Sequence, residues 1–178
     1  EENEFRAFRS AINAGVTFIM TEHIAVPSIT GGSKLPASME PKLVKGIIRD
    51  KLGFKGIVTS DDLWYEHVIT RFGGAEEVAI RALESGHDII LKPKNPIGTI
   101  RAVADAVRSG RISIEQIDSS VYKLLYQKAL LGLPDEKLVD EAKIDEIVGT
   151  TAHKAIVQEV ADRSVTLLKN ENILPLKN

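Results

Sequence analysis

Two adjacent carboxylates are the residues best suited to carry chemistry in this sequence. Asp61 and Asp62 directly follow the segment 56–60, which is expected to be a buried strand. Carboxylates at the end of a buried strand are costly unless they are paired, hydrogen-bonded or solvated in a cleft. Such a pair could ligate Mg²⁺, accept a proton or attack an anomeric carbon. It could equally cap a helix or form a salt bridge in a loop. Because successive side chains of an extended backbone point opposite ways, only one of the two is expected to face a site.

One histidine occupies a comparable position. His23 follows Met20, Thr21 and Glu22 at the end of another apolar run, so it either lines a site or has a structural role. His67, His87 and His153 have no such placement, and we interpret them as structural or solvated. No two histidines stand at the spacing of metal ligands, so a zinc site is not expected. No residue is assigned to a cofactor.

Other polar and aromatic side chains near these positions remain open to two interpretations. Lys92 and Lys94 follow a third apolar run and could bind an anionic group, although a solvated loop explains them as well. Trp64 and Tyr65 could form an aromatic platform for a sugar ring or pack between helices. No Gly-rich phosphate-binding motif is present.

The three apolar runs belong to a repeated helix–strand pattern that would position these residues. Strands are expected at 16–20, 56–60 and 88–91, as continuous apolar runs buried on both faces. Residues with helical spacing precede or follow them, at 5–12, 43–52, 75–83, 97–107 and, after a Ser113 cap, 114–125. Ser38 is expected to cap the second of these helices, with Pro41 in its first turn. The pattern predicts an α/β fold with a parallel sheet, whose chemistry lies at the carboxyl ends of the strands.

The composition excludes several classes of protein. The chain has 178 residues, of which 43% are hydrophobic and 27% charged, with a net charge of −2. These values are ordinary for a globular protein. The net charge shows no excess of basic residues of the kind that binds nucleic acid. No apolar run reaches the roughly 20 residues of a membrane span. The absence of cysteine excludes disulfides and leaves both a cytoplasmic and an exported location open.

Several motifs together resemble glycoside hydrolase family 3. The strongest is Leu-Gly-Phe-Lys-Gly-Ile-Val-Thr-Ser-Asp-Asp-Leu at 52–63, which resembles the β-N-acetylhexosaminidase branch. It is accompanied by Met-Thr-Glu-His-Ile at 20–24, Leu-Pro-Ala-Ser at 35–38 and Ala-Leu-Glu-Ser-Gly-His-Asp at 82–88. The tail at 162–176 resembles the entry into that family's second, α/β sandwich domain. One departure concerns Tyr65, where many hexosaminidases have Met.

The resemblance implies a specific fold and domain organisation. Residues 1–134 are expected to be the C-terminal portion of a (β/α)8 TIM barrel, with about its last three strands. Residues 135–150 would be a linker, and 151–178 the beginning of a second α/β domain with its first helix and strand. The chain would then be a piece of a longer protein. It would need the missing upstream barrel and second-domain sequence, or would oligomerise through exposed edges.

The resemblance also implies an activity. The chain is expected to be part of a retaining exo-β-glycosidase acting on a carbohydrate substrate, with Asp61 as the nucleophile and Asp62 supporting it. With the position of His23 and the aromatic ring of Tyr65, this makes His23, Asp62 and Tyr65 the expected substrate-binding residues. The acid/base residue is expected to lie outside this chain, so the chain alone should be nearly inactive. The favoured branch is β-N-acetylglucosaminidase, and β-glucosidase is the alternative. A non-catalytic assembly module and a Mg²⁺-dependent lyase or aldolase on a similar barrel are the rival interpretations.

Overall fold

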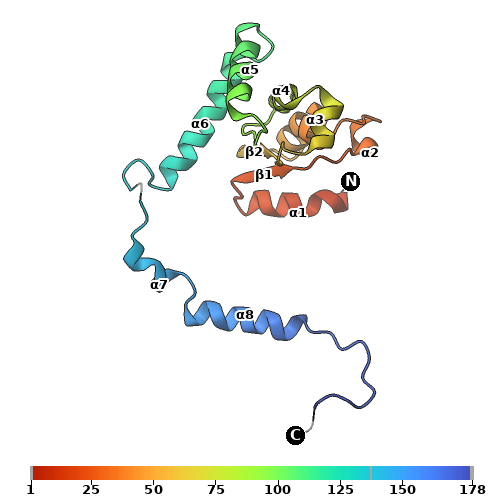
Figure 1. Cartoon of the computed structure of the whole chain (residues 1–178), viewed down its shortest axis with the longest axis vertical. Helices are drawn as coiled ribbons and strands as arrows, with labels where there is room; N and C mark the ends of the chain where they lie inside the picture. The colour runs from red at the N-terminus through yellow and green to blue at the C-terminus, as the bar shows by residue number, and fades with distance from the viewer. Residues whose placement is uncertain (1, 137, 177–178) are drawn as a thin grey trace. The chain divides into compact units, whose positions relative to one another are not determined.

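The protein comprises two compact units, spanning residues 1–131 and 132–178 (Figure 1). The computed structural model describes residues 2–136 and 138–176. The N-terminal unit is an α/β structure, rich in helices, with a two-stranded parallel sheet. The predicted α/β class is therefore confirmed.

The sheet pairs β1 (Phe18–Thr21) with β2 (Ile57–Ser60) in parallel. Phe18 lies opposite Ile57, and Thr21 lies opposite Ser60, so both strands end at the same edge. Helical structure between residues 27 and 51 connects the two strands, as parallel pairing requires. The shared carboxyl edge brings the segments that follow each strand together.

The third predicted strand lies beside β2 but forms a single parallel bridge, between Thr59 and Ile89. Two backbone N–H groups that would donate to backbone carbonyls in a longer parallel sheet donate to side chains instead. Asp88 Oδ2 accepts from the Val58 N–H at 2.9 Å, and Ser60 Oγ accepts from the Leu91 N–H at 3.0 Å. The third segment therefore lies parallel to β2, where the sequence predicted a strand, but it is too irregular to be a strand.

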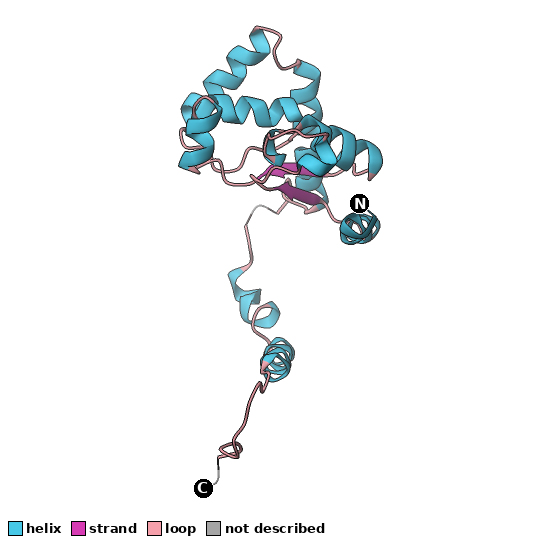
Figure 2. Ribbon diagram, turned by 90° about the vertical axis from the view of Figure 1, so that its right-hand side faces the viewer, coloured by secondary structure: helices cyan, strands magenta, loops and turns pink. Residues whose placement is uncertain are grey.

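Helices lie above and beside the two strands in the view of Figure 2. The periodic segments of the sequence form helices close to their expected positions. The helical elements of the N-terminal unit are α1 (Glu2–Asn13), α2 (Pro27–Thr30), η1 (Ala37–Met39), the π-helical η2 (Lys42–Lys51), α3 (Glu66–Phe72), α4 (Ala75–Ser85), α5 (Pro96–Arg108) and α6 (Ile114–Leu130). The short helix α3, directly after the two carboxylates, was not expected.

The core consists of three hydrophobic clusters, and the second and third of them include residues of α4. The first joins β1 and β2 to η2 through Ile19, Val58 and Val44. The second packs η1 and α3 against α4, and the third packs α4 against α5 and the start of α6. Helix α4 ends at Gly86, whose φ of 110° lies in the left-handed region that suits glycine. The segments that follow β1 and β2 are therefore held at the sheet edge by packing against α4.

Two expectations of the sequence are wrong. Ser38 does not cap a helix, because its hydroxyl is hydrogen-bonded to the His23 ring inside the buried turn η1. Strand β1 is not buried on both faces, since Phe18 is 43% and Met20 50% exposed while Ile19 and Thr21 are buried. The alternation arises because η2 covers one face of β1 and no described element covers the other.

The C-terminal unit contains η3 (Glu141–Lys143), α7 (Ile144–Ile147) and α8 (Thr151–Ser164). Thr150 caps α8 by accepting the His153 N–H, and the helix lies where the sequence predicts it. The Asn170 side chain closes the expected turn through the N–H groups of Ile173 and Leu174. The apolar segments on either side of this turn form no strand in the described part of the chain.

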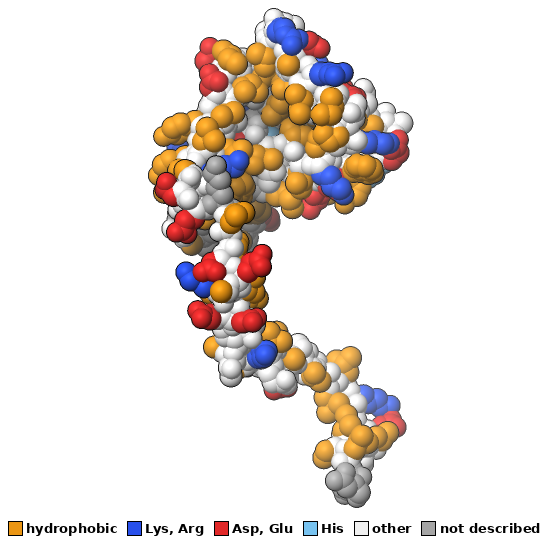
Figure 3. Space-filling view, turned by 60° about the vertical axis from the view of Figure 1, so that its left-hand side comes forward, with side chains coloured by type: hydrophobic (Ala, Val, Ile, Leu, Met, Phe, Trp, Pro, Cys, Tyr) orange, Lys and Arg blue, Asp and Glu red, His pale blue; other side chains and the backbone are white. Residues whose placement is uncertain are grey.

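Many hydrophobic side chains remain exposed in both units (Figure 3). In α8 the exposed set includes Ile156, Val157 and Val160, each more than half exposed. Among residues 2–136 and 138–176, no helix combines the length and the apolar character that crossing a membrane requires.

Candidate active site

The carboxyl edge of the sheet positions Asp61 directly after β2. Its backbone N–H donates to the Thr21 carbonyl at 2.9 Å, which continues the pairing between the two strands by one residue. The Asp61 side chain is partly buried. Within the described residues its carboxylate has neither a hydrogen-bond donor nor a cationic partner. Asp61 is therefore anchored through its backbone, while its carboxylate stays available for a ligand.

Asp62 is held in a different way. Its Oδ2 accepts from Lys92 Nζ at 2.7 Å, and its Oδ1 accepts from the Trp64 N–H at 2.7 Å. Lys92 also lies over the Trp64 ring, 5.7 Å from its centroid. The hydrogen bond from Lys92 lowers the pKa of Asp62, and the same bond raises the pKa of Lys92. Asp62 is thus an ionised group already engaged by the protein.

His23 fixes the backbone beside these carboxylates. Its Nε2 lies 2.8 Å from the Asp62 carbonyl, and its Nδ1 lies 2.7 Å from Ser38 Oγ. Because a carbonyl only accepts, Nε2 carries a hydrogen and donates it, and in the neutral ring Nδ1 accepts from the Ser38 hydroxyl. Both ring nitrogens are therefore occupied. Tyr65 meets the same ring edge-on, with centroids 5.6 Å apart, and is itself 48% exposed.

A second histidine lies beneath the edge. His87 is almost fully buried, and its Nε2 lies 2.7 Å from Thr21 Oγ1. Burial lowers the pKa of His87 to about 4, so the ring is neutral at pH 7. His87 accordingly belongs to the structural group in which the sequence had placed it. His67 and His153 are exposed.

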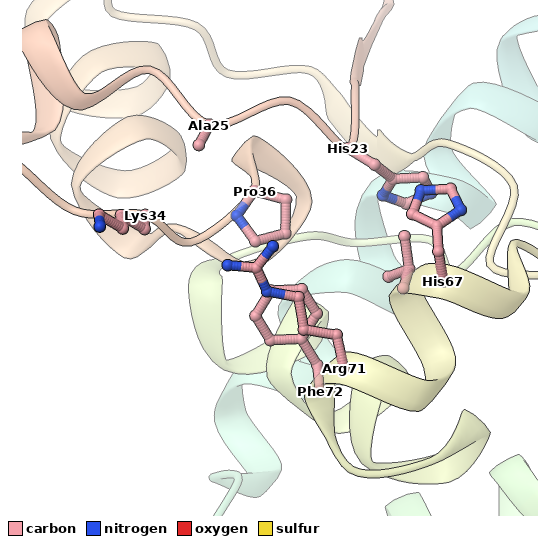
Figure 4. A pocket seen from close by; sticks show the side chains of 8 residues that line it. His23, Ala25, Lys34, Pro36, His67, Arg71 and Phe72 are labelled. Atoms are coloured by element: carbon pink, nitrogen blue, oxygen red, sulfur yellow. The ribbon is translucent and has the colours of Figure 1, made fainter.

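A small pocket of about 160 Å³ opens beside His23 (Figure 4). Its other polar side chains come from α3 and from the loop before η1, and all carry nitrogen. The pocket is lined by His23, Ala25, Lys34, Pro36, His67, Val68, Arg71 and Phe72. No group of His, Asp and Glu side chains in the described residues has the arrangement of a metal site.

Comparison with known proteins places this geometry in a family. Residues 1–126 match the family model described as the glycosyl hydrolase family 3 N-terminal domain. The chain belongs to glycosyl hydrolase family 3. The resemblance carried by the motif at 52–63 is thereby confirmed at the level of the family.

Family 3 relatives that are named for different activities resemble this chain to a similar degree. A Cellulomonas fimi β-N-acetylglucosaminidase/β-glucosidase is 31% identical over 181 residues, covering 95% of this chain and 31% of that protein. A probable β-glucosidase C of Aspergillus flavus is 32% identical over 191 residues, covering 99% and 29%. The chain spans about a third of the length of these relatives.

Solved structures agree with this assignment. A family 3 β-N-acetylglucosaminidase from Paenibacillus sp. str. FPU-7 superimposes with a TM-score of 0.84 at 34% identity, covering 98% of this chain and 33% of that one. The β-glucoside phosphorylase BglX superimposes with a TM-score of 0.86 at 26% identity, covering 97% and 33%.

Three residues of this candidate site were not assigned to it from sequence. Ser38 holds the His23 ring, Lys92 pairs with Asp62, and Thr21 anchors both Asp61 and His87. Lys92 could have been selected as the single cation directly following the third apolar run. The Ser38 and Thr21 contacts depend on tertiary packing, and no local pattern marks them. Lys94, weighed with Lys92, pairs with Glu66.

Proposed function

We propose that this chain contributes the nucleophile of a retaining exo-β-glycosidase, and that Asp61 is that nucleophile. The observation that carries the proposal is the contrast between the two adjacent carboxylates. Asp62 is occupied by Lys92 and the Trp64 backbone, whereas the Asp61 carboxylate has no partner among the described residues. A nucleophile must offer a free oxygen to the sugar, and only Asp61 meets that condition.

The reaction would proceed in two steps with net retention. The Asp61 carboxylate attacks the anomeric carbon as the glycosidic C–O bond breaks, and the departing oxygen takes a proton from an acid supplied by the rest of the protein. Water then attacks the same carbon, losing its proton to that group, and Asp61 is released. The ammonium of Lys92 keeps its neighbour Asp62 ionised, which leaves Asp62 unsuited to act as the proton donor.

The three other predicted site residues would support this step. Asp62 orders the turn after the nucleophile through its bonds to Lys92 and Trp64. His23 holds the Asp62 carbonyl, and because both its nitrogens are occupied its contact with sugar would be through ring carbons. Tyr65, half exposed against His23, would offer a face or a hydroxyl to the substrate.

We propose that residues 1–134 form part of a (β/α)8 barrel. Two parallel strands and a third parallel segment, alternating with helices, support this arrangement. An apolar groove of about 370 Å³ along β1, lined in part by Phe8, Met20 and Ile24, is consistent with a further strand and helix packing there. In the same proposal, 135–150 is a linker and 151–178 begins a second domain, which would cover the exposed side chains of α8.

We favour β-N-acetylglucosaminides as substrates, because the motif at 52–63 resembles that branch and one similar structure carries that name. β-Glucosides are the alternative, supported by relatives named β-glucosidase. The test is to assay the full-length protein with aryl N-acetylglucosaminide and aryl glucoside, comparing the parent with Asp61→Ala. We expect Asp61→Ala to lose at least 10³-fold in kcat on the preferred substrate. Asp105→Ala, at an exposed carboxylate of α5, is the control. An Asp61→Ala rate equal to the parent would refute the assignment.

A non-catalytic assembly module is the second candidate, favoured by the apolar groove along β1. This interpretation requires the isolated chain to associate through that groove. A monomeric, folded species in size-exclusion chromatography would therefore exclude it, whereas a dimer that dissociates in Met20→Glu would support it.

A further inference from the structure

Beneath the carboxyl edge of the sheet, two buried polar side chains form a hydrogen-bonded pair. Thr21, the last residue of β1, is 5% exposed, and His87, just after α4, is 1% exposed. Thr21 Oγ1 lies 2.7 Å from His87 Nε2. Burying two polar groups is costly unless they are hydrogen-bonded, so the contact needs both partners.

The direction of the hydrogen bond follows from the other side of the imidazole ring. His87 Nδ1 lies 2.9 Å from the Ala82 carbonyl, which can only accept, so Nδ1 carries the hydrogen. In the neutral ring Nε2 is then an acceptor, and the Thr21 hydroxyl donates to it. The Ser85 hydroxyl, also 2.9 Å from Nδ1, is itself 2.7 Å from the Ala82 carbonyl and donates there. The α4 C-terminus therefore sets both the tautomer and the position of the ring.

The same threonine holds the nucleophile. Its backbone carbonyl accepts from the Asp61 N–H at 2.9 Å. On the far side of the dipeptide, the Asp62 carbonyl accepts from His23 Nε2. The Asp61–Asp62 segment is thus fixed at both ends, at one end through Thr21 and His87 and at the other through His23 and Ser38.

We infer that Thr21 and His87 form a positioning unit for Asp61, transmitting the fixed geometry of the α4 C-terminus to the backbone of the nucleophile. The inference rests on the proposed function, in which Asp61 attacks the sugar. An attacking oxygen must be held close to its target, and a misplacement of about 1 Å can cost roughly a hundredfold in rate. Neither side chain is expected to touch substrate, because both are buried.

The test compares matched threonine variants of the full-length protein. Thr21→Val removes the donor while keeping the shape, and Thr21→Ser keeps the donor. Thr99→Val is the same exchange at a buried threonine of α5, whose hydroxyl has no hydrogen-bond partner among the described residues. The quantity measured is kcat per active site, counted by covalent labelling of the nucleophile. We expect Thr21→Val to lose at least about tenfold in kcat with little change in KM. Thr21→Ser should stay within about threefold of the parent, and Thr99→Val should match it.

Two variants of His87 test the same hydrogen bond by changing its acceptor instead of its donor. They provide the test if Thr21→Val does not fold. The side-chain amide of His87→Gln reaches the Nε2 position and can accept from Thr21, whereas that of His87→Asn reaches only the Nδ1 position and donates to Ala82. The kcat of His87→Gln should therefore exceed that of His87→Asn.

A purely structural role predicts a lower melting temperature with unchanged kcat per labelled site. That result for Thr21→Val, or equal kcat for the two His87 variants, would overturn the inference. Failure of the proposed function is recognised separately, because Asp61→Ala would then keep the parent rate.

Discussion

Protonation of His87 is expected to weaken the folded protein at mildly acidic pH. Burial lowers its pKa from 6.5 to about 4, because the charged ring would lose its hydration inside the protein. Its Nε2 lies against Thr21, whose hydroxyl donates to the neutral ring. Between pH 6.5 and 4 the unfolded chain therefore binds a proton that the folded chain does not. Stability that is fully present above pH 6.5 is lost progressively as the pH falls to about 4.

The size of this effect follows from the two pKa values. Each pKa unit corresponds to about 1.4 kcal/mol, so the full loss is about 3 kcal/mol, and about 2 kcal/mol of it should appear between pH 7 and pH 5. Urea unfolding at the two pH values measures this difference directly. In His87→Gln, which has no titrating ring, the loss between pH 7 and pH 5 should be smaller by about 2 kcal/mol.

His153→Gln is the matched control, since His153 is an exposed histidine in α8. It should show the same pH dependence as the parent. If His87→Gln and the parent lose equal stability between pH 7 and pH 5, the buried neutral state of His87 is refuted.

Four further substitutions test other parts of the structure. Asp88→Asn should lower the free energy of unfolding by about 3 kcal/mol, measured in urea, because it leaves two cations beside a buried, uncharged group. Gly56→Ala should cost about 1–3 kcal/mol in the same assay, since a Cβ there would lie 2.5 Å from a backbone oxygen and an aromatic carbon. Gly46→Ala, at an open helical position, should be neutral or stabilising by up to about 1 kcal/mol. Lys92→Met should raise the pKa of Asp62, followed by NMR of its carboxyl carbon, because it removes the hydrogen bond that lowers that pKa.

For each substitution, one result would refute the interaction on which the prediction depends. Asp105→Asn breaks an exposed ion pair and should change stability by less than about 0.5 kcal/mol. An equally small change for Asp88→Asn would show that its ion pairs contribute nothing. Equal effects of alanine at Gly56 and Gly46 would remove the steric argument. An unchanged Asp62 titration in Lys92→Met would mean that the hydrogen bond does not exist in solution.

The sequence predicted the features that depend on local patterns. Helical spacing located α4 and α5, and the apolar run at 56–60 located β2, because each pattern reflects which side chains face the core. Asp61 could be selected because a carboxylate at the end of such a run is conspicuous. Strands β1 and β2 pair although the residues opposite each other are 39 positions apart in the sequence. Their pairing was predicted from the βαβ pattern, and no individual residue contact indicated it.

The features that the sequence did not predict depend on contacts between distant segments. Ser38 fits the pattern of a helix cap, yet its hydroxyl reaches a histidine 15 positions earlier. The regularity of the third strand was lost because Asp88 and Ser60 side chains replace ladder hydrogen bonds. The role of Lys92 depends on a partner 30 positions away. Such contacts are set by packing, and although the position of Lys92 after an apolar run is visible locally, the sequence does not show which residue each side chain contacts.

In the proposed mechanism Asp61 becomes covalently bonded to the sugar. The most direct measurement uses the full-length protein and an activated fluoro-sugar, whose glycosyl-enzyme is hydrolysed slowly, followed by trypsin digestion and fragmentation mass spectrometry. Asp61 and Asp62 lie on the same tryptic peptide, Gly56 to Arg71, and fragment ions between them distinguish the two. We predict one sugar on Asp61. A sugar on Asp62 or on another peptide, or complete turnover with no covalent adduct, would contradict the account.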